Sequence, residues 1–254
     1  MKITAIMGSP HKGNGYKLVK KIEKNLKSLN KEIELNYIFL SETDLKMCKG
    51  CFLCFSKGED FCPLKDSRES IEKEISESDG VILSSPGYAW NVSGLMKNFI
   101  DRISYTLHRP KFFNQSLMVV TNGGSGLKKV NKVLSMCLGG AEKICEISII
   151  TTPYETTKKY SEQTNKIIEK NTKKFHNSLL KDKIKPVNLG NLIWFNLFKK
   201  MATLSKETIP ADFEYYKTKK NYFYETKLNP LKKTIAILIS SLAVWSMKKK
   251  VKFK

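Results

Sequence analysis

A regular alternation of short apolar runs and amphipathic segments over the first 180 of 254 residues is the strongest constraint on the fold of this chain. The apolar runs predict strands, and apolar residues three and four positions apart predict helices between them. The expected strands are Ile3–Met7, Ile33–Leu40, Gly80–Ser84, Ser116–Thr121 and Lys143–Ile150. The expected helices are the segment of Leu18–Leu29, then Ser67–Ser78, Ser93–Leu107 with Ser93 as its cap, Leu127–Leu138 and Tyr154–Leu180. Such alternation predicts an α/β domain over residues 1–180, with a five-stranded parallel sheet between two helical layers.

After residue 180 the pattern changes to a basic helical C-terminal extension, residues 181–254, which we treat as a second domain. It contains two apolar helical segments, Leu189–Leu204 and Leu231–Met247, and an aromatic stretch, Phe213–Tyr224. It holds 17 Lys and 5 acidic residues, so +12 of the net charge of +21 lies there. Only three of the 45 basic residues are Arg. Because base and phosphate readout favours arginine, we expect no nucleic-acid partner.

The cysteines and the N-terminus indicate the compartment. Met1–Gly8 reads as a strand that ends in a turn, so we expect no signal peptide. Six cysteines without such a signal favour a reducing cytoplasm, where clustered thiols are metal ligands or redox groups more often than disulfides. Cys137 and Cys145 stand alone in helix and strand patterns, and we expect both to be buried core residues.

The turn after the first strand is a candidate anion site. Ligands of parallel sheets bind at the carboxyl ends of the strands. Gly8–Gly15 reads GSPHKGNG and leads into a helix, so backbone N–H groups can converge on an anion at a helix N-terminus. The turn matches neither the P-loop nor the dinucleotide-binding glycine pattern. A glycine turn that serves only close helix packing is the alternative.

Two segments resemble the NADPH-dependent FMN reductase family. GSPHKGNGYKL is similar to its phosphate loop, and residues 84–102, SSPGYAWNVSGLMKNFIDR, are similar to the segment after its third strand. The resemblance implies a flavodoxin-like fold with FMN as cofactor. It places the FMN phosphate among Ser9, His11, Lys12, Asn14 and Gly15. His11 stands where Arg is common and Gly15 where Thr or Ser is common, which removes a hydroxyl donor and favours a lower FMN affinity.

Two further loops are expected to hold the flavin ring, because a flat isoalloxazine needs an apolar or aromatic wall and polar groups at its edge. After the third strand these residues are Pro86, Gly87, Tyr88, Trp90, Asn91 and Val92. After the fourth strand they are Thr121, Asn122, Gly123 and Gly124, which we assign by position alone. Core packing is the alternative for the two aromatic side chains. We expect Asp101 and Arg102 to form a structural ion pair.

Four cysteines form a compact array, Cys48-x2-Cys51-x2-Cys54-x7-Cys62, followed by Pro63. Such runs hold [4Fe–4S] clusters, because three ligands two residues apart wrap three corners and a fourth closes the site. The array also resembles that of the iron–sulfur flavoproteins, relatives of the FMN reductases. A four-thiolate zinc site and four thiols without a metal are the alternatives.

The resemblance implies an FMN-dependent oxidoreductase that passes electrons between NAD(P)H or a ferredoxin-type donor, FMN and the cluster. Flavin chemistry needs no protein nucleophile, so we expect no catalytic side chain. We read His108 and His176 as surface residues without partners. The alternatives are an electron carrier without its own small-molecule substrate, a metal-free flavin reductase, and a binding protein in which the domain is only a scaffold.

The last apolar segment, Thr234–Met247, has 14 residues between lysines. A bilayer span needs about 20, so this segment is too short to cross one. It suits a helix buried against its own domain or in a homo-oligomer. It also suits a helix on an anionic membrane surface, with contact through residues 229–254. We therefore expect a cytoplasmic protein, either free or peripheral at the membrane.

Overall fold

The computed structural model describes residues 1–181 and 187–253. Its five strands form one parallel sheet in the order β2-β1-β3-β4-β5. They are β1 (Lys2–Met7), β2 (Glu34–Phe39), β3 (Gly80–Pro86), β4 (Ser116–Gly123) and β5 (Glu142–Ile150). This is the flavodoxin-like order, in which the winding direction switches between β1 and β3. The predicted α/β fold is confirmed.

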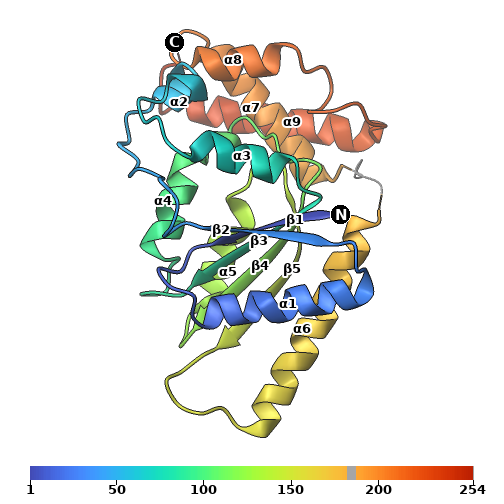
Figure 1. The fold of residues 1–254 in the computed structure, drawn as a ribbon. Coiled ribbons are helices and arrows are strands. Elements are labelled where there is room, and N and C mark those ends of the chain that lie inside the picture. The colour runs from blue at the N-terminus through green and yellow to red at the C-terminus, as the bar shows by residue number, and fades with distance from the viewer. Residues whose placement is uncertain (182–186, 254) are drawn as a thin grey trace. The chain divides into compact units, whose positions relative to one another are not determined.

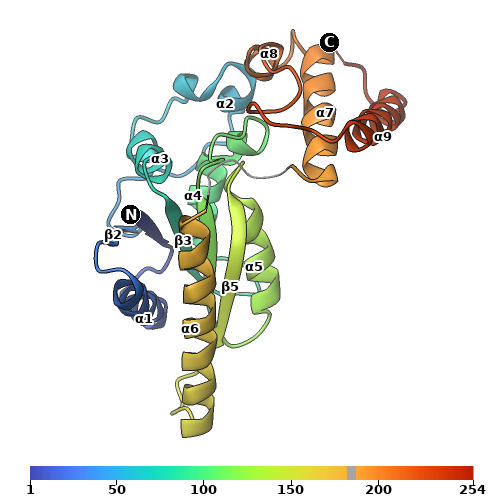
Figure 2. The ribbon, with the colours of Figure 1, turned by 90° about the vertical axis from the view of Figure 1, so that its right-hand side faces the viewer.

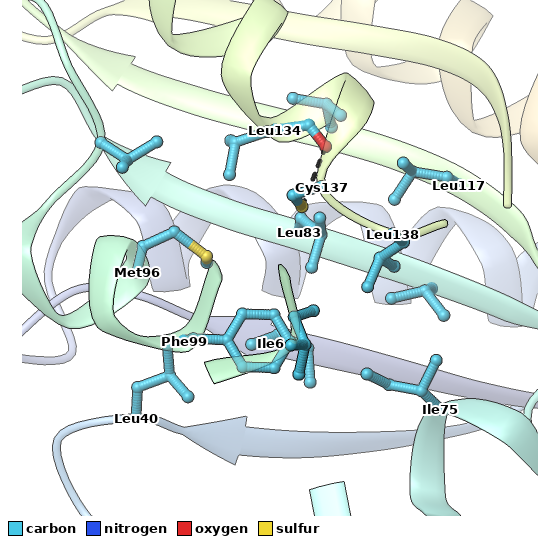
Figure 3. Packing of buried hydrophobic residues seen from close by; sticks show 14 of the residues in the cluster. Ile6, Leu40, Ile75, Leu83, Met96, Phe99, Leu117, Leu134, Cys137 and Leu138 are labelled. Atoms are coloured by element: carbon cyan, nitrogen blue, oxygen red, sulfur yellow. Dashed lines mark hydrogen bonds between the residues drawn. The ribbon is translucent and has the colours of Figure 1, made fainter. Parts of the chain in front are cut away.

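Helices cover both faces of this sheet (Figures 1 and 2). One face carries α1 (Asn14–Leu29) and α6 (Lys158–Leu179), and the other carries α3 (Arg68–Ser76), α4 (Gly94–Arg102) and α5 (Leu127–Met136). Side chains of β3 alternate between the two cores, as the period of two in a strand requires. Figure 3 shows one core, where Leu83 lies among Met96, Phe99 and Leu134.

The observed helix bounds differ from the expected ones in several places, and for two helices the cause is local. The segment 93–107 is not one helix, because Ile103 leaves the helical region after α4 and a 3₁₀ turn, Ser104–Leu107, follows. Ser93 caps α4 as predicted, since its hydroxyl accepts a hydrogen bond from the Met96 N–H at 3.2 Å. The last helix of the domain begins at Lys158 rather than Tyr154, because Thr157 is the residue that caps it.

Packing divides the described chain into two compact units. The first contains Met1–Cys48, Leu64–Leu107 and the chain from Lys111 through α6. The second contains Lys49–Pro63, His108–Pro110 and the C-terminal helices. Most of the cysteine loop is thus grouped with residues from the end of the chain. The division at residue 180 stays a prediction, and residues 182–186 beside it lie outside the described residues.

The second unit has its own core. Its helices are α2 (Leu53–Ser56), α7 (Leu189–Leu204), α8 (Pro210–Lys217) and α9 (Pro230–Lys248), with a 3₁₀ turn at Glu59–Phe61. The ring of Phe195 lies 5.0 Å from that of Phe223 and 5.5 Å from that of Tyr222, between centroids. The aromatic stretch that stands out in the sequence therefore supplies α8 and much of this core. Over residues 1–181 and 187–253, no helix combines the length and apolar composition that crossing a bilayer requires.

Candidate functional site

The turn after β1 is fixed to the rest of the first unit. The Gly8 N–H donates to the Ser84 carbonyl at 2.8 Å, and the Ser93 hydroxyl donates to the Gly8 carbonyl. A Cβ at Gly8 would lie 2.8 Å from the Cβ of Met96, so only glycine lets α4 approach this closely. The turn is therefore held against β3 and the start of α4.

The N-terminus of α1 is open to an anion. Gly13 is its cap residue, no side chain of the described chain caps it, and its first turn has no acidic residue. The first N–H groups of a helix lack intrahelical partners and lie at its positive end, so a phosphate suits this position. His11, Lys12 and Asn14 are exposed around it. The Lys12 ammonium, however, pairs with Glu42 at 2.8 Å and lies 4.3 Å from the centre of the Phe39 ring.

Asn122 lies close to Gly15 of α1. A Cβ at Gly15 would lie 3.0 Å from Asn122 Oδ1 and 3.3 Å from the Ser84 hydroxyl oxygen. A threonine or serine at this position would require these side-chain atoms to shift by a few tenths of an ångström. Asn122 Nδ2 donates to Thr151 at 3.3 Å, whereas its buried Oδ1 has no hydrogen-bond partner within the described chain. An unpaired buried acceptor at this position is what a donor group of a ligand can satisfy.

The loop after β3 is a tight turn over Tyr88–Asn91. Backbone hydrogen bonds of 3.0 and 2.9 Å join its two ends. Ala89 and Trp90 have φ of 47° and 59°, the left-handed region that costs a non-glycine residue roughly 1–2 kcal/mol. The Tyr88 and Trp90 side chains are 48% and 63% exposed, which excludes the core-packing alternative for them. Strain at a sheet edge is typical of functional sites.

The loop after β4 supports this turn. The Gly87 N–H donates to the Asn122 carbonyl at 2.8 Å, and Trp90 Nε1 donates to the Ser125 hydroxyl at 3.3 Å. Gly126 has φ of 72°, and a Cβ there would lie 2.2 Å from Trp90 Cδ1, so the indole lies directly on a glycine. The structure thus brings together the three predicted loops at the carboxyl ends of β1, β3 and β4.

Not every predicted flavin residue presents its side chain there. Val92 packs in the core, and Thr121 is fully buried, where its hydroxyl donates to Asn131 Oδ1 at 2.8 Å. Gly123 approaches the backbone of Gly87 and has φ of 152°. The Val92 and Thr121 side chains are therefore not presented at this edge of the sheet, and the role of these three residues toward a flavin stays a prediction.

The expected ion pair between Asp101 and Arg102 is wrong. Consecutive residues of a helix point in different directions. Arg102 donates instead to both carboxylate oxygens of Asp66, at 2.7 and 2.8 Å, whereas Asp101 pairs with Lys97 at 2.5 Å. The Asp66 carboxylate also accepts from the Lys46 N–H at 2.9 Å. Through Asp66, Arg102 therefore fixes the chain just before the cysteine loop, at Lys46, and just after it, at Asp66.

Asn98 of α4 anchors the start of that loop. Its Oδ1 accepts from the Cys48 N–H at 2.9 Å, and its Nδ2 donates to the carbonyls of Leu45 and Lys46 at 3.1 and 3.2 Å. No signal in the sequence distinguishes Asn98 from its neighbours, although it belongs to the segment 84–102 that resembles the family. Its amide offers a donor and an acceptor to the backbone, so the position of Cys48 follows from α4.

A buried polar network holds the cysteine loop inside the second unit. Arg109 donates to the Cys54 carbonyl at 2.5 Å, to Glu59 at 3.0 Å and to Asp212 of α8 at 2.5 Å. Arg109 and Asp212 are both about one-twentieth exposed. The expectation that His108 has no partner is wrong, because its Nδ1 lies 2.8 Å from Asp212 Oδ2. Its ring also packs on Phe55 and Phe198, at 4.8 and 4.9 Å between centroids.

The four cysteines of the array are accessible to different degrees. Cys51 is exposed, and Cys48, Cys54 and Cys62 are half-buried. Left-handed residues, among them Gly50 and Phe52, turn the chain between them. In the part of the chain that the structure describes, no three His, Cys, Asp or Glu side chains are arranged around one metal position. By chemistry, a compact set of four thiols suits an iron–sulfur cluster or zinc.

The two isolated cysteines are core residues, as predicted. Cys137 and Cys145 are 3% and 5% exposed. Burial raises the pKa of each thiol to about 12. The Cys137 thiol donates to the Leu134 carbonyl at 3.2 Å (Figure 3). Because metal ligation requires a thiolate, neither is suited to be a metal ligand.

Comparison with known proteins identifies the family. Residues 1–144, more than half of the chain, match the family model of the NADPH-dependent FMN reductases. The chain belongs to this family. Members use FMN, so this FMN reductase relative is an oxidoreductase with a flavin cofactor.

Sequence relatives place it in the iron–sulfur flavoprotein branch of the FMN reductase family. An iron–sulfur flavoprotein of Clostridioides difficile (strain 630) is 32% identical over 222 residues, which cover 85% of this chain and 95% of that protein. An iron–sulfur flavoprotein of Archaeoglobus fulgidus is 33% identical over 162 residues, 61% of this chain and 77% of that protein. The match to the Clostridioides difficile protein covers 85% of this chain, which is more than residues 1–180. It therefore includes part of the C-terminal region, residues 181–254.

Solved structures share the fold of this FMN reductase relative. An oxidoreductase from Corynebacterium diphtheriae has a TM-score of 0.51 at 14% identity, covering 71% of this chain and 97% of that one. An azoreductase from Bacillus anthracis (strain Sterne) has a TM-score of 0.50 at 12% identity, covering 70% and 98%. At these identities the likeness concerns the fold alone.

Proposed function

We propose that this FMN-dependent oxidoreductase passes electrons between NAD(P)H or a ferredoxin-type donor, FMN, and a [4Fe–4S] cluster on Cys48, Cys51, Cys54 and Cys62. The observation that carries the flavin part is the meeting of three loops at the carboxyl ends of β1, β3 and β4. An uncapped helix N-terminus, a strained aromatic turn and an unpaired amide oxygen lie in these loops.

The residues of this edge have distinct proposed roles. The N–H groups at the start of α1 bind the phosphate, with Ser9, His11, Lys12, Asn14 and Gly15 around it. Tyr88 and Trp90 provide the aromatic wall, and Asn122 Oδ1 accepts a hydrogen bond from the ligand. When bound, FMN supplies two-electron acceptance and one-electron release. The protein contributes binding and orientation.

The proposed cluster rests on the chemistry of the cysteine array and on the two relatives described above, which are iron–sulfur flavoproteins. Arg109 and Asn98 would orient two of its ligands, since they bind the backbone at Cys54 and Cys48. Zinc and metal-free thiols are the rival outcomes, so iron must be measured directly.

Anaerobic purification followed by a visible spectrum and by flavin, iron and zinc analysis tests both cofactors. We expect FMN, and about four irons per chain. Cys51→Ser should remove iron and keep FMN, whereas Cys145→Ala, which removes a buried core thiol, should keep both. A flavin-positive, iron-free protein after reconstitution would leave a metal-free flavin reductase.

Stopped-flow reduction separates an enzyme from an electron carrier. We expect NADPH or NADH to bleach the flavin band. Reduction by ferredoxin alone would instead make the protein an electron-transfer flavoprotein without its own small-molecule substrate. Self-association, which sedimentation velocity measures, and a cytoplasmic location remain predictions. Contact with a membrane through residues 229–254 is a separate proposal that rests on the surface of α9.

A further inference from the structure

Helix α9 packs on α7 through its small side chains. Ala236, Ser240 and Val244 are buried, and their spacing of four residues places them on one face. Lys200 of α7 donates to the Ile237 carbonyl of α9 at 3.0 Å and to the Ser241 hydroxyl. Packing within the second unit therefore covers the small-residue face of α9.

The opposite face of α9 carries its large apolar side chains. Leu231, Leu238, Leu242 and Trp245 are between 59% and 69% exposed. Their spacings of seven, four and three residues place them along a single stripe, directly opposite the buried face. We call these four residues the α9 stripe. A contiguous apolar stripe that stays exposed on a folded unit marks an interaction surface.

Lysines flank the α9 stripe at both ends of the helix. Residues 226–254 contain eight Lys and no acidic residue. Lys232 and Lys233 lie in the first turn of α9, and Lys248–Lys250 at its end. The Lys249 ammonium lies 3.5 Å from the centre of the Trp245 ring, on the stripe itself. A second copy of this helix would bring lysines against lysines, whereas an anionic surface neutralises them.

We propose that the α9 stripe docks on the surface of an anionic lipid bilayer. The leucines and Trp245 enter the boundary between headgroups and acyl chains, and the flanking lysines contact lipid phosphates. Tryptophan is favoured at this depth because its ring is apolar and its N–H is polar. The apolar segment is too short to span, so the helix lies in the plane of the membrane. This inference does not depend on the cofactors.

Vesicle flotation with the full chain tests the proposal. We expect binding to vesicles of phosphatidylcholine with phosphatidylglycerol, weak binding to phosphatidylcholine alone, and release from the anionic vesicles at high salt. Leu238→Gln with Leu242→Gln should lower the partition coefficient by about tenfold or more, because two apolar side chains lose their burial in lipid. These positions are exposed, so the unit should fold as before.

Met136→Gln with Ile167→Gln is the matched control, since these side chains are exposed apolar residues of α5 and α6. This pair should leave vesicle binding unchanged. Brominated lipids should quench fluorescence in the native chain, and Trp245→Phe should remove that quenching. Failure to bind anionic vesicles, or equal binding to both vesicle types, would overturn the proposal. A dimer that the leucine pair abolishes, without vesicle binding, would assign the α9 stripe to a second copy.

Discussion

At the scale of single residues, the loop after β3, which we propose as part of the flavin site, has backbone dihedral angles that its residue types do not favour. Ala89 and Trp90 both adopt positive φ, although neither is glycine. The hydrogen bonds across Tyr88–Asn91 and the contact of Trp90 with Gly126 hold the turn in this shape. These contacts offset the backbone strain, and the turn therefore presents the Tyr88 and Trp90 rings before a ligand arrives.

Substitution at Ala89 should separate turn shape from side-chain chemistry. Ala89→Gly keeps a residue that accepts positive φ, so FMN affinity should stay near its native value. Ala89→Val places a β-branched residue there, and we expect FMN to bind about tenfold more weakly. Fluorescence titration with FMN measures both. Equal affinities for the two variants would contradict the proposed role of the turn.

Glu23 of α1 makes the first unit sensitive to acid. Burial raises the pKa of this carboxyl, but hydrogen bonds from Lys20, Lys27 and Tyr37 outweigh burial and lower it from 4.5 to about 2. Because the pKa of Glu23 is lower in the folded chain than in the unfolded chain, the ionised carboxylate stabilises the fold, and this contribution is fully present above pH 4.5. It is lost as the pH falls toward 2, and it amounts to at most about 3 kcal/mol.

Glu23→Gln should therefore flatten the fall in stability between pH 4.5 and 2. Urea unfolding at a series of pH values measures this slope. Glu162→Gln, at an exposed position of α6, should keep the native slope. An unchanged slope in Glu23→Gln would show that other carboxylates account for the acid sensitivity.

At the scale of elements, α8 is joined to the cysteine loop through one buried carboxylate. Asp212 accepts from Arg109, which also donates to the Cys54 carbonyl, and it lies beside His108. The two contacts of Asp212 link residues 103 and 104 positions apart. The network lets the C-terminal helices stabilise a loop that has little apolar core of its own.

Asp212→Asn removes one of the two carboxylate partners of the buried Arg109 guanidinium and leaves Glu59, so we expect a loss of about 2 kcal/mol in the second unit. The loop should loosen, so thiol-reactive reagents should label the metal-free protein faster. Glu214→Gln on the same helix is the control, because Glu214 is exposed and pairs only with Lys217 among the contacts observed. Equal labelling rates in both variants would contradict a role of Asp212 in ordering the loop.

At the scale of the whole molecule, the two units do not follow the order of the chain. Lys49–Pro63 belong with the C-terminal helices, although they interrupt the first unit in sequence. The sheet and its two cores are complete without α7, α8 and α9. The loops that we propose for flavin binding thus belong to the first unit, whereas Lys49–Pro63 of the cysteine loop belong to the second.

A chain of residues 1–181 should accordingly bind FMN and fail to retain iron after anaerobic reconstitution. The cysteine loop would lack Asp212 and the α8 surface on which it folds. Cofactor analysis per chain measures the outcome. Removal of residues 249–254 alone should leave both cofactors bound. If the chain of residues 1–181 retained iron, the result would favour a domain boundary at residue 180, with the whole cysteine loop in the first domain.

Several features could be predicted from the sequence because their cause is local. Apolar periodicity indicated five strands and their helices, Ser93 was identifiable as a cap, and isolated Cys137 and Cys145 read as core residues. The three loops of the proposed flavin site could be predicted because they come directly after β1, β3 and β4 in the sequence. Bounds were wrong where a cap or a backbone turn decided them, as at Thr157 and Ile103.

The sequence by itself determined that this chain forms a doubly wound sheet with a glycine turn, an aromatic loop and a cysteine array, since each is written in neighbouring residues. Only the tertiary structure decided the partners of Arg102, His108 and Arg109, because the residues they contact lie 36 to 104 positions away. It also decided which face of α9 is covered. An apolar segment indicates that burial is favourable, but only the fold buries Ala236, Ser240 and Val244 and leaves the four residues of the α9 stripe exposed.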